Sequence, residues 1–142
     1  MFNCDGMHVL DARHGHRKLV ITVETEAEAT GCPGCGVLAT GHGRRKVTAA
    51  DAPCFGVSVL IIWLKRVWRC AEPDCSTGTW SEMHELIAPR AVLTSRAITW
   101  ATDALVGDDT TISALARHLR VDWHTLWRAV KAEAVTRTST SP

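Results

Sequence analysis

The chain has 142 residues, of which 46% are hydrophobic and 22% are charged, and its formal net charge is +1. This composition is typical of a soluble globular protein with one ordinary domain or two small ones. The low net charge excludes a globally basic protein, so any binding of nucleic acid has to come from a local patch. The N-terminus has no apolar run typical of a secretory signal, and the most apolar segment, residues 55–63, is too short to span a bilayer. We therefore expect a cytoplasmic protein without membrane partners, in which paired cysteines bind metal more often than they form disulfides.

The first half of the chain has the pattern of a β-rich fold. Residues 7–25 predict two strands around the segment His14–His16, where Gly15 can take a positive φ. A short strand is expected at residues 44–51, and residues 55–70 are long enough for one bent strand or two. The last segment is rich in β-branched and aromatic residues on both faces, which favours a central strand covered on both sides. Its length leaves a buried helix as the alternative.

The second half of the chain has helical periodicity. Residues 93–107 place apolar side chains on one helical stripe, with Thr94 as the expected N-cap and Gly107 as the stop signal. Residues 110–134 predict two short helices joined by a tight turn, the first capped by Thr110 or Thr111 and the second by Asp122. The second of these helices is expected to bury Trp123, Leu126, Trp127 and Val130.

The predicted fold class is therefore α+β. A small, zinc-ribbon-like β-rich domain is expected over residues 1–86, followed by a three-helix domain over residues 87–136. A hinge is expected near residues 84–90, and the polar residues 137–142 are expected to form a disordered tail.

Two close pairs of cysteines are the strongest chemical signal in the sequence. Cys32 and Cys35 are separated by two residues within "GCPGCG", and Cys70 and Cys75 are separated by four. Structural Zn²⁺ takes four ligands in a tetrahedron, and the two sulfurs of a close pair can face the same ion. The chain between the pairs is long enough to leave as one strand and return as its partner. The spacing predicts a structural Zn²⁺ site, whose closed shell leaves no position for a reacting water.

Other interpretations of these cysteines remain open. All of them can be buried packing residues, and Cys32 with Cys35 can form a redox dithiol. Cys4, Cys54 or His42 can replace Cys75 as the fourth ligand, although none of the three has a partner at a metal-ligand spacing. Packing or surface roles are the simpler interpretation of these three residues.

The last two helices have the spacing of a helix-turn-helix, with Arg120 at the turn position that is often glycine. The types of the outward side chains suit the recognition of DNA. Arg128 can contact a guanine edge, while the others can reach bases or phosphates. The candidate DNA-binding residues are His124, Thr125, Arg128 and Lys131 on the second helix and Arg117 on the first. A solvated amphipathic helix whose charges only face water is an equally good interpretation of the periodicity alone.

Four segments in the order "CPGCG", "KRVWRCAEPDCSTGTWSE", "LTSRAITWA" and "ISALARHLRVDWHTLWRAV" resemble the N-terminal part of insertion-sequence L-three transposases, over about residues 30–134. This resemblance implies a zinc-binding domain followed by a helix-turn-helix, which together recognise the terminal inverted repeats of the element in double-stranded DNA. Trp80 stands where the family pattern often has phenylalanine, and Cys54 stands where the family is not known to use a ligand. The resemblance places the metal ligands at Cys32, Cys35, Cys70 and Cys75.

The sequence departs from the family at its end. Members of the family continue into a catalytic domain whose acidic triad binds divalent metal and cuts DNA, whereas this sequence stops at Pro142. We therefore expect a DNA-binding module, truncated or N-terminal, that is not an enzyme and takes no small-molecule substrate. Its expected partners are double-stranded DNA and either a second copy of itself or a full-length transposase. The alternative is a zinc-stabilised adaptor that binds another protein through its ribbon and its sheet edge.

Overall fold

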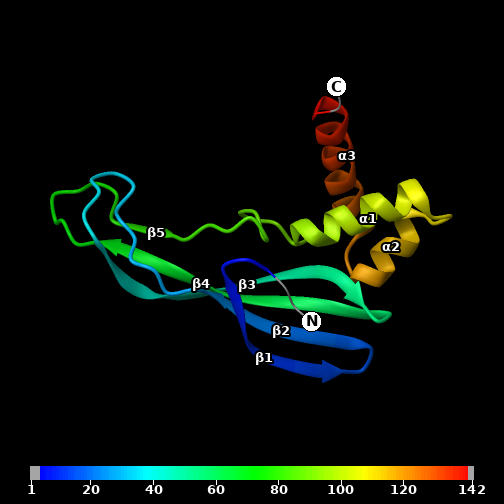
Figure 1. Ribbon diagram of the computed structural model, residues 1–142, viewed down its shortest axis with the longest axis horizontal. Coiled ribbons are helices and arrows are strands. Elements are labelled where there is room, and N and C mark those ends of the chain that lie inside the picture. Colours follow the sequence, from blue (N-terminus) through cyan, green and yellow to red (C-terminus); the bar gives the residue numbers. More distant parts are fainter. Residues whose placement is uncertain (1–3, 141–142) are drawn as a thin grey trace.

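The computed structural model describes residues 4–140, which form five strands followed by three helices (Figure 1). The strands are β1 (Met7–Gly15), β2 (Lys18–Thr25), β3 (Ala39–Cys54), β4 (Val57–Cys70) and β5 (Thr79–Ser81). The helices are α1 (Ser95–Gly107), α2 (Ile112–Leu119) and α3 (Trp123–Thr140). This order confirms the α+β class, with a β-rich part first and three helices after it.

Strand β4 is the centre of the sheet, whose order is β1-β2-β4-β3. β3 pairs antiparallel with β4 from the hairpin turn to its far end. On its other edge, β4 pairs first with β2, in parallel over Ser58–Trp63, and then with β5, antiparallel over Val67–Arg69. Ile61 and Trp63 on β4 are fully buried. The prediction of a central strand is therefore confirmed and the helical alternative is excluded, but only the face of Val59, Ile61 and Trp63 is fully covered, and Leu60, Ile62 and Leu64 on the other face are half-buried.

β3 and β4 form a long two-stranded arm that runs the length of the molecule (Figure 1). They meet in a turn at Phe55 and Gly56, which both have positive φ (50° and 74°) and so match the twist of the strands. At the other end of the arm, Ala39 pairs with Cys70. The chain thus leaves one cysteine pair as β3 and returns to the other as β4, as predicted. β3 is 16 residues long, because its pairing with β4 extends well beyond the short strand expected from local sequence.

The turn between β1 and β2 differs from the sequence expectation. Gly15 pairs with Lys18 in the β1–β2 ladder, so the two-residue turn consists of His16 and Arg17. The residue with positive φ is Arg17, at 56°, and not Gly15. The carbonyl of Arg17 accepts a hydrogen bond from Nη2 of Arg120, at 3.3 Å, which joins this turn to the helical part.

The segment between β5 and α1 packs on the sheet. Leu86 and Ile87 are each only 2% exposed, and they share a hydrophobic core with Ile61 and Trp63 of β4. The segment that was expected to be a hinge, residues 84–90, therefore contributes to the sheet's own core. The expected domain boundary between residues 86 and 87 falls inside this packed segment.

The three helices form a second core, which reaches the sheet at Ala50 of β3. The hydroxyl oxygen of Thr94 accepts from the amide of Ala97 at 3.0 Å, and that of Thr111 accepts from the amide of Ala114 at 3.1 Å. These bonds confirm the predicted N-cap of α1 and select Thr111 as the cap of α2. Besides Ala50, the buried residues of this core are Leu93, which precedes α1, and the helix residues Ala97, Ala101, Ala104, Leu115, Ala116, Leu119, Leu126 and Val130.

A buried polar network joins the start of α1 to β3. Asp51 on β3 is only 5% exposed, and its carboxylate accepts from the Thr94 hydroxyl at 2.7 Å and forms an ion pair with Arg96. The backbone of Ala50 donates to the carbonyl of Val92 and accepts from the amide of Thr94, both at 2.9 Å. The junction between sheet and helices is therefore held by backbone bonds, a cap and a buried charge together.

The C-terminal end of the chain is more ordered than expected. Residues 137–140 belong to α3, whereas residues 141–142 of the predicted tail lie outside the described residues. Arg137 explains the extension, because it pairs with Glu133 at 3.0 Å and with Asp103 of α1 at 2.8 Å. Within residues 4–140, no helix has both the length and the apolar character that crossing a membrane requires.

Replacing Thr94 with valine should lower the free energy of unfolding by about 2–3 kcal/mol, because the helix loses its cap and buried Asp51 loses a donor. The matched control is Thr111→Val, which removes a cap of the same kind at an exposed position and should cost about 1 kcal/mol. Urea unfolding followed by circular dichroism measures both values. Equal effects of the two substitutions would show that the contact with Asp51 contributes nothing.

Candidate metal centre and helix-turn-helix surface

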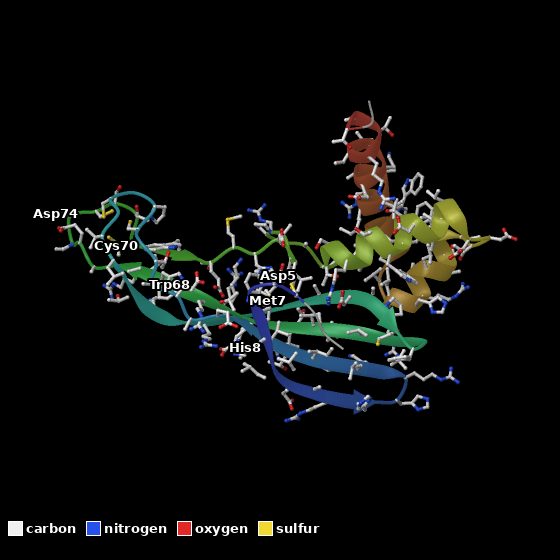
Figure 2. All side chains as sticks on the ribbon, in the orientation of Figure 1. Asp5, Met7, His8, Trp68, Cys70 and Asp74 are labelled. Atoms are coloured by element: carbon white, nitrogen blue, oxygen red, sulfur yellow. The ribbon has the colours of Figure 1, made fainter. Side chains whose placement is uncertain are left out.

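Four thiols meet at the end of the β3–β4 arm, where Cys70 and Asp74 mark the tip in Figure 2. The four sulfur atoms lie within 4.8 Å of one another, with Cys32 and Cys75 3.7 Å apart and Cys35 and Cys70 3.5 Å apart. A zinc tetrahedron with Zn–S bonds of about 2.3 Å places its sulfurs about 3.8 Å apart. A disulfide requires about 2.05 Å, and all four cysteines are free thiols. The donor set and its spacing fit one Zn²⁺ ion.

The stretch "GCPGCG" folds into a tight turn around Cys32. The amide of Gly36 donates to the Cys32 carbonyl at 2.9 Å, and the amide of Gly34 points to the Cys32 sulfur at 3.4 Å. Gly36 has a φ of 78°, which a residue with a Cβ rarely adopts. A Cβ on Gly34 would overlap the hydroxyl of Thr77. Both glycines are therefore needed to close the turn on its sulfurs.

The wider second pair forms an equivalent turn. The amide of Glu72 lies 3.4 Å from the sulfur of Cys70, and the amide of Cys75 donates to the carbonyl of Glu72 at 3.2 Å. Amide donors directed at sulfur favour the thiolate and orient it toward a metal ion. In both pairs, therefore, the amide two residues after the first cysteine is directed at the sulfur of that cysteine.

The four thiols hold their protons with different strength. Burial raises the pKa of Cys32, but hydrogen bonds from the Thr77 hydroxyl and from backbone amides outweigh it and lower this pKa to about 6. The amide of Glu72 lowers the pKa of Cys70, but burial and the neighbouring thiols raise it to about 12. Zn²⁺ binds thiolates, so it has to displace the proton of Cys70. The affinity for zinc therefore falls as the pH falls, and it falls more steeply below about pH 6, where Cys32 also takes up a proton.

The remaining candidate ligands lie elsewhere. Cys4 and Cys54 pack against the hydrophobic core of the sheet, and His42 is exposed on β3. Among residues 4–140, the cluster of potential metal ligands consists of the two cysteine pairs alone. Packing, and not metal binding, is thus the role that the structure gives Cys4 and Cys54.

The connection between α2 and α3 has the geometry of a helix-turn-helix. Arg120 adopts the left-handed conformation (φ 57°, ψ 43°), and its amide bonds back to the carbonyl of Arg117 at 3.2 Å. The amide of Val121 bonds to the carbonyl of Ala116 at 3.1 Å, which completes a Schellman motif. Arginine therefore occupies the glycine position as predicted. Asp122 precedes α3 as expected, but its carboxylate makes no hydrogen bond within the described part of the chain.

Most of the predicted DNA-binding side chains are exposed. His124, Arg128 and Lys131 face outward on α3, Arg117 faces outward on α2, and Thr125 is half-buried. In residues 4–140, none of the three cations Arg117, Arg128 and Lys131 forms an ion pair with a carboxylate. These cations are thus available to an anionic partner.

Two tryptophans on α3 were predicted to be buried and are not. Trp123 is 41% exposed and Trp127 is 39% exposed, whereas Leu126 and Val130 supply the buried stripe. The prediction was wrong because α3 packs on the helical core through Leu126, Ala129 and Val130, and the two tryptophans lie at the side of this contact. The two indoles lie one turn apart beside this stripe and stack, with ring centroids 6.0 Å apart. The available sign in the sequence was the width of the predicted apolar face. Its four large side chains are more than a helix needs to pack against only two other helices, so some of them had to remain exposed.

Protein purified without chelator should contain one zinc ion per chain, with Cys4 and Cys54 as the reactive thiols. Removing the metal should release the tip of the arm and change the near-ultraviolet circular dichroism, because Trp68 and Trp80 pair across β4 and β5 close to the cluster. Metal analysis, thiol titration and dichroism test this. An unchanged spectrum after proven removal of the metal would contradict it.

Gly34→Ala should reduce zinc retention against a competing chelator by about 10-fold or more, because the added methyl displaces Thr77 and with it the second knuckle. Gly41→Ala is the control, since a Cβ at that exposed site meets nothing within 4 Å. Equal retention in both variants would show that the close approach of Gly34 to Thr77 is not needed for the site.

Comparison with known families agrees with this geometry. Residues 28–75 match the family described as the zinc-finger of transposase IS204/IS1001/IS1096/IS1165, and residues 82–134 match the helix-turn-helix domain of transposase family ISL3. Searches for similar curated proteins and solved structures find no significant match. The first range contains the four-cysteine cluster, and the second contains the three helices up to residue 134 of α3. The chain therefore carries the zinc ribbon and the DNA-binding helix-turn-helix of the ISL3 transposase family.

Proposed function

We propose that this module recognises the terminal inverted repeats of its insertion sequence in double-stranded DNA, with α3 as the recognition helix. The observation that carries the proposal is the outward face of α3, where Arg128 and Lys131 have no carboxylate partner among the described residues. A solvated helix would tend to neutralise such charges with neighbours four residues away, as Arg137 and Glu133 do further along α3.

The side chains on this face have separate roles. Arg128 donates two hydrogen bonds to a guanine edge in the major groove, which provides sequence discrimination. His124 and Thr125 lie in the first turn of α3, where they reach bases or phosphates. Lys131 and Arg117 bind phosphates and set the position of the module on the duplex.

The exposed indoles of Trp123 and Trp127 support the assignment of this face of α3 to DNA binding. The ammonium of Lys131 lies 5.9 Å from the ring centroid of Trp127, which restrains a long flexible side chain. His124 lies edge-on to Trp123 with ring centroids 5.0 Å apart. The two indoles therefore hold His124 and Lys131 in place before DNA arrives, and they offer an apolar surface to thymine methyl groups.

The zinc ribbon has a structural role in this proposal. Four thiolates close the coordination shell, so the ion orders the tip of the arm and takes no part in chemistry on DNA. The terminal repeats of an element are two copies of one site, so we infer that two modules act together, either as a homodimer or within the full-length transposase.

Arg128→Ala should weaken binding to a duplex carrying the terminal repeat by about 1–3 kcal/mol and leave binding to a mixed-sequence duplex nearly unchanged. Lys131→Ala should weaken both to a similar degree, because a phosphate contact carries no sequence information. Fluorescence anisotropy with labelled duplexes measures these affinities. An unchanged preference in Arg128→Ala would overturn the role of Arg128. Failure of the wild-type protein to bind either duplex would overturn the proposed function in favour of a protein adaptor.

A further inference from the structure

A basic groove lies between the β3–β4 arm and the segment that joins β5 to α1. Its volume is about 540 Å³, and its lining contains cations but no carboxylate-bearing residue. The cations that line it are Arg45, Lys65 and Arg90, whereas Lys46, which also borders it, is adjacent to Arg45 on β3 and directs its side chain to the other face of the sheet. A chain with a net charge of only +1 therefore concentrates positive charge at one place outside the helix-turn-helix.

Arg45 and Lys65 lie directly opposite each other across the β3–β4 ladder. Like charges in this position destabilise a sheet. The adjacent pair, Arg44 and Arg66, points to the other face, where Glu24 forms ion pairs with both arginines. Within residues 4–140, no carboxylate forms an ion pair with Arg45 or Lys65. One basic pair thus shares a carboxylate within the protein, whereas the pair at the groove has none.

Arg90 adds a third cation at a conformational cost. The amide of Ala91 bonds to the carbonyl of Ala88 at 3.0 Å, and the turn between them holds Pro89 and Arg90. Arg90 has a φ of 65° at the position where this kind of turn favours glycine. Arginine is unfavourable in this backbone conformation, and Arg90 lines the same groove as the other cations. Both facts indicate that Arg90 has a role other than stability.

We propose that the basic groove binds phosphates of the DNA backbone, as a second contact surface that does not read sequence. The inference rests on the proposed function of the helix-turn-helix. Guanidinium and ammonium groups are the usual ligands of phosphate oxygens. Lys65 has no carboxylate partner among the described residues, and its ammonium lies 5.0 Å from the ring centroid of Trp63. Arg90 precedes the N-cap Thr94 by four residues, and in the view of Figure 1 both the connecting segment and α3 lie above the strands. The proposal is that one duplex meets the groove and the recognition helix together.

The double variant Arg45→Gln/Lys65→Gln tests the groove directly. The zinc-loaded chain is titrated into a labelled mixed-sequence duplex at a series of NaCl concentrations. The slope of log K against log salt should become shallower by about 0.9 for each phosphate contact that is lost. The charge-matched control is Arg13→Gln/Arg44→Gln, which removes two arginines that have carboxylate partners and should leave the slope unchanged. An unchanged slope in the groove variant, or an equal loss in the control, would overturn the proposal.

Arg90→Gly separates binding from folding. Glycine removes the unfavourable backbone conformation, so the midpoint of urea unfolding should rise while the affinity for DNA and the salt slope decrease. Wild-type affinity in this variant would remove Arg90 from the groove's function. Because a misfolded protein cannot gain stability, the opposite signs of the two changes exclude damage to the fold as the cause.

The two proposals fail in different ways. The groove variants should keep the wild-type preference for the terminal repeat, whereas Arg128→Ala should lose that preference and keep most of the salt slope. A wild-type protein that binds duplexes with a slope insensitive to Arg45 and Lys65 would overturn the groove alone. A wild-type protein that binds polyglutamate through these residues, and no duplex, would assign the groove to an acidic polypeptide and overturn both proposals.

Discussion

The pairing of β3 with β4 is the interaction on which the rest of the structure depends. At one end of this ladder, Ala39 lies opposite Cys70, so the register of the strands brings the two cysteine pairs together. At the other end, Ala50 forms the backbone bonds that fix the start of α1. Between these two ends, beyond a register shift between Gly41 and Arg44, the ladder sets Arg45 against Lys65. A shift of one residue would turn every side chain to the other face and separate all three features.

Features that depend on local chemistry could be predicted from the sequence. The gap of two residues in Cys32–Cys35 and the glycines around it specify a turn that closes on a metal ion, whatever the surrounding fold. Thr94 and Thr111 act as caps because their hydroxyls bond to amides three residues away. The left-handed turn at Arg120 was likewise readable from the helix-turn-helix spacing. Each of these depends on bonds within a few residues.

Features that depend on distant pairing could not be predicted. The buried charge of Asp51 is stabilised by Thr94 and Arg96, more than forty residues away, and nothing in the local sequence connects them. The exposure of Trp127 depends on how narrowly α3 meets its neighbours, which periodicity does not reveal. The basic groove is the clearest case, because Arg44 and Arg45 look alike in the sequence and only the pleat of the sheet separates the neutralised one from the open one.

This distribution of charge explains how a nearly neutral chain can bind a polyanion. Arg44, Arg66 and Arg137 are held by carboxylates and serve the fold, so they add little to the external field. Several of the cations without such partners lie on the outward face of α3 and in the groove, where repulsion among neighbouring cations lowers the stability of the free protein. In the proposed complex, DNA phosphates relieve that repulsion. Part of the driving force for binding is therefore already present in the free protein as unfavourable cation pairs, and a large net charge is not required.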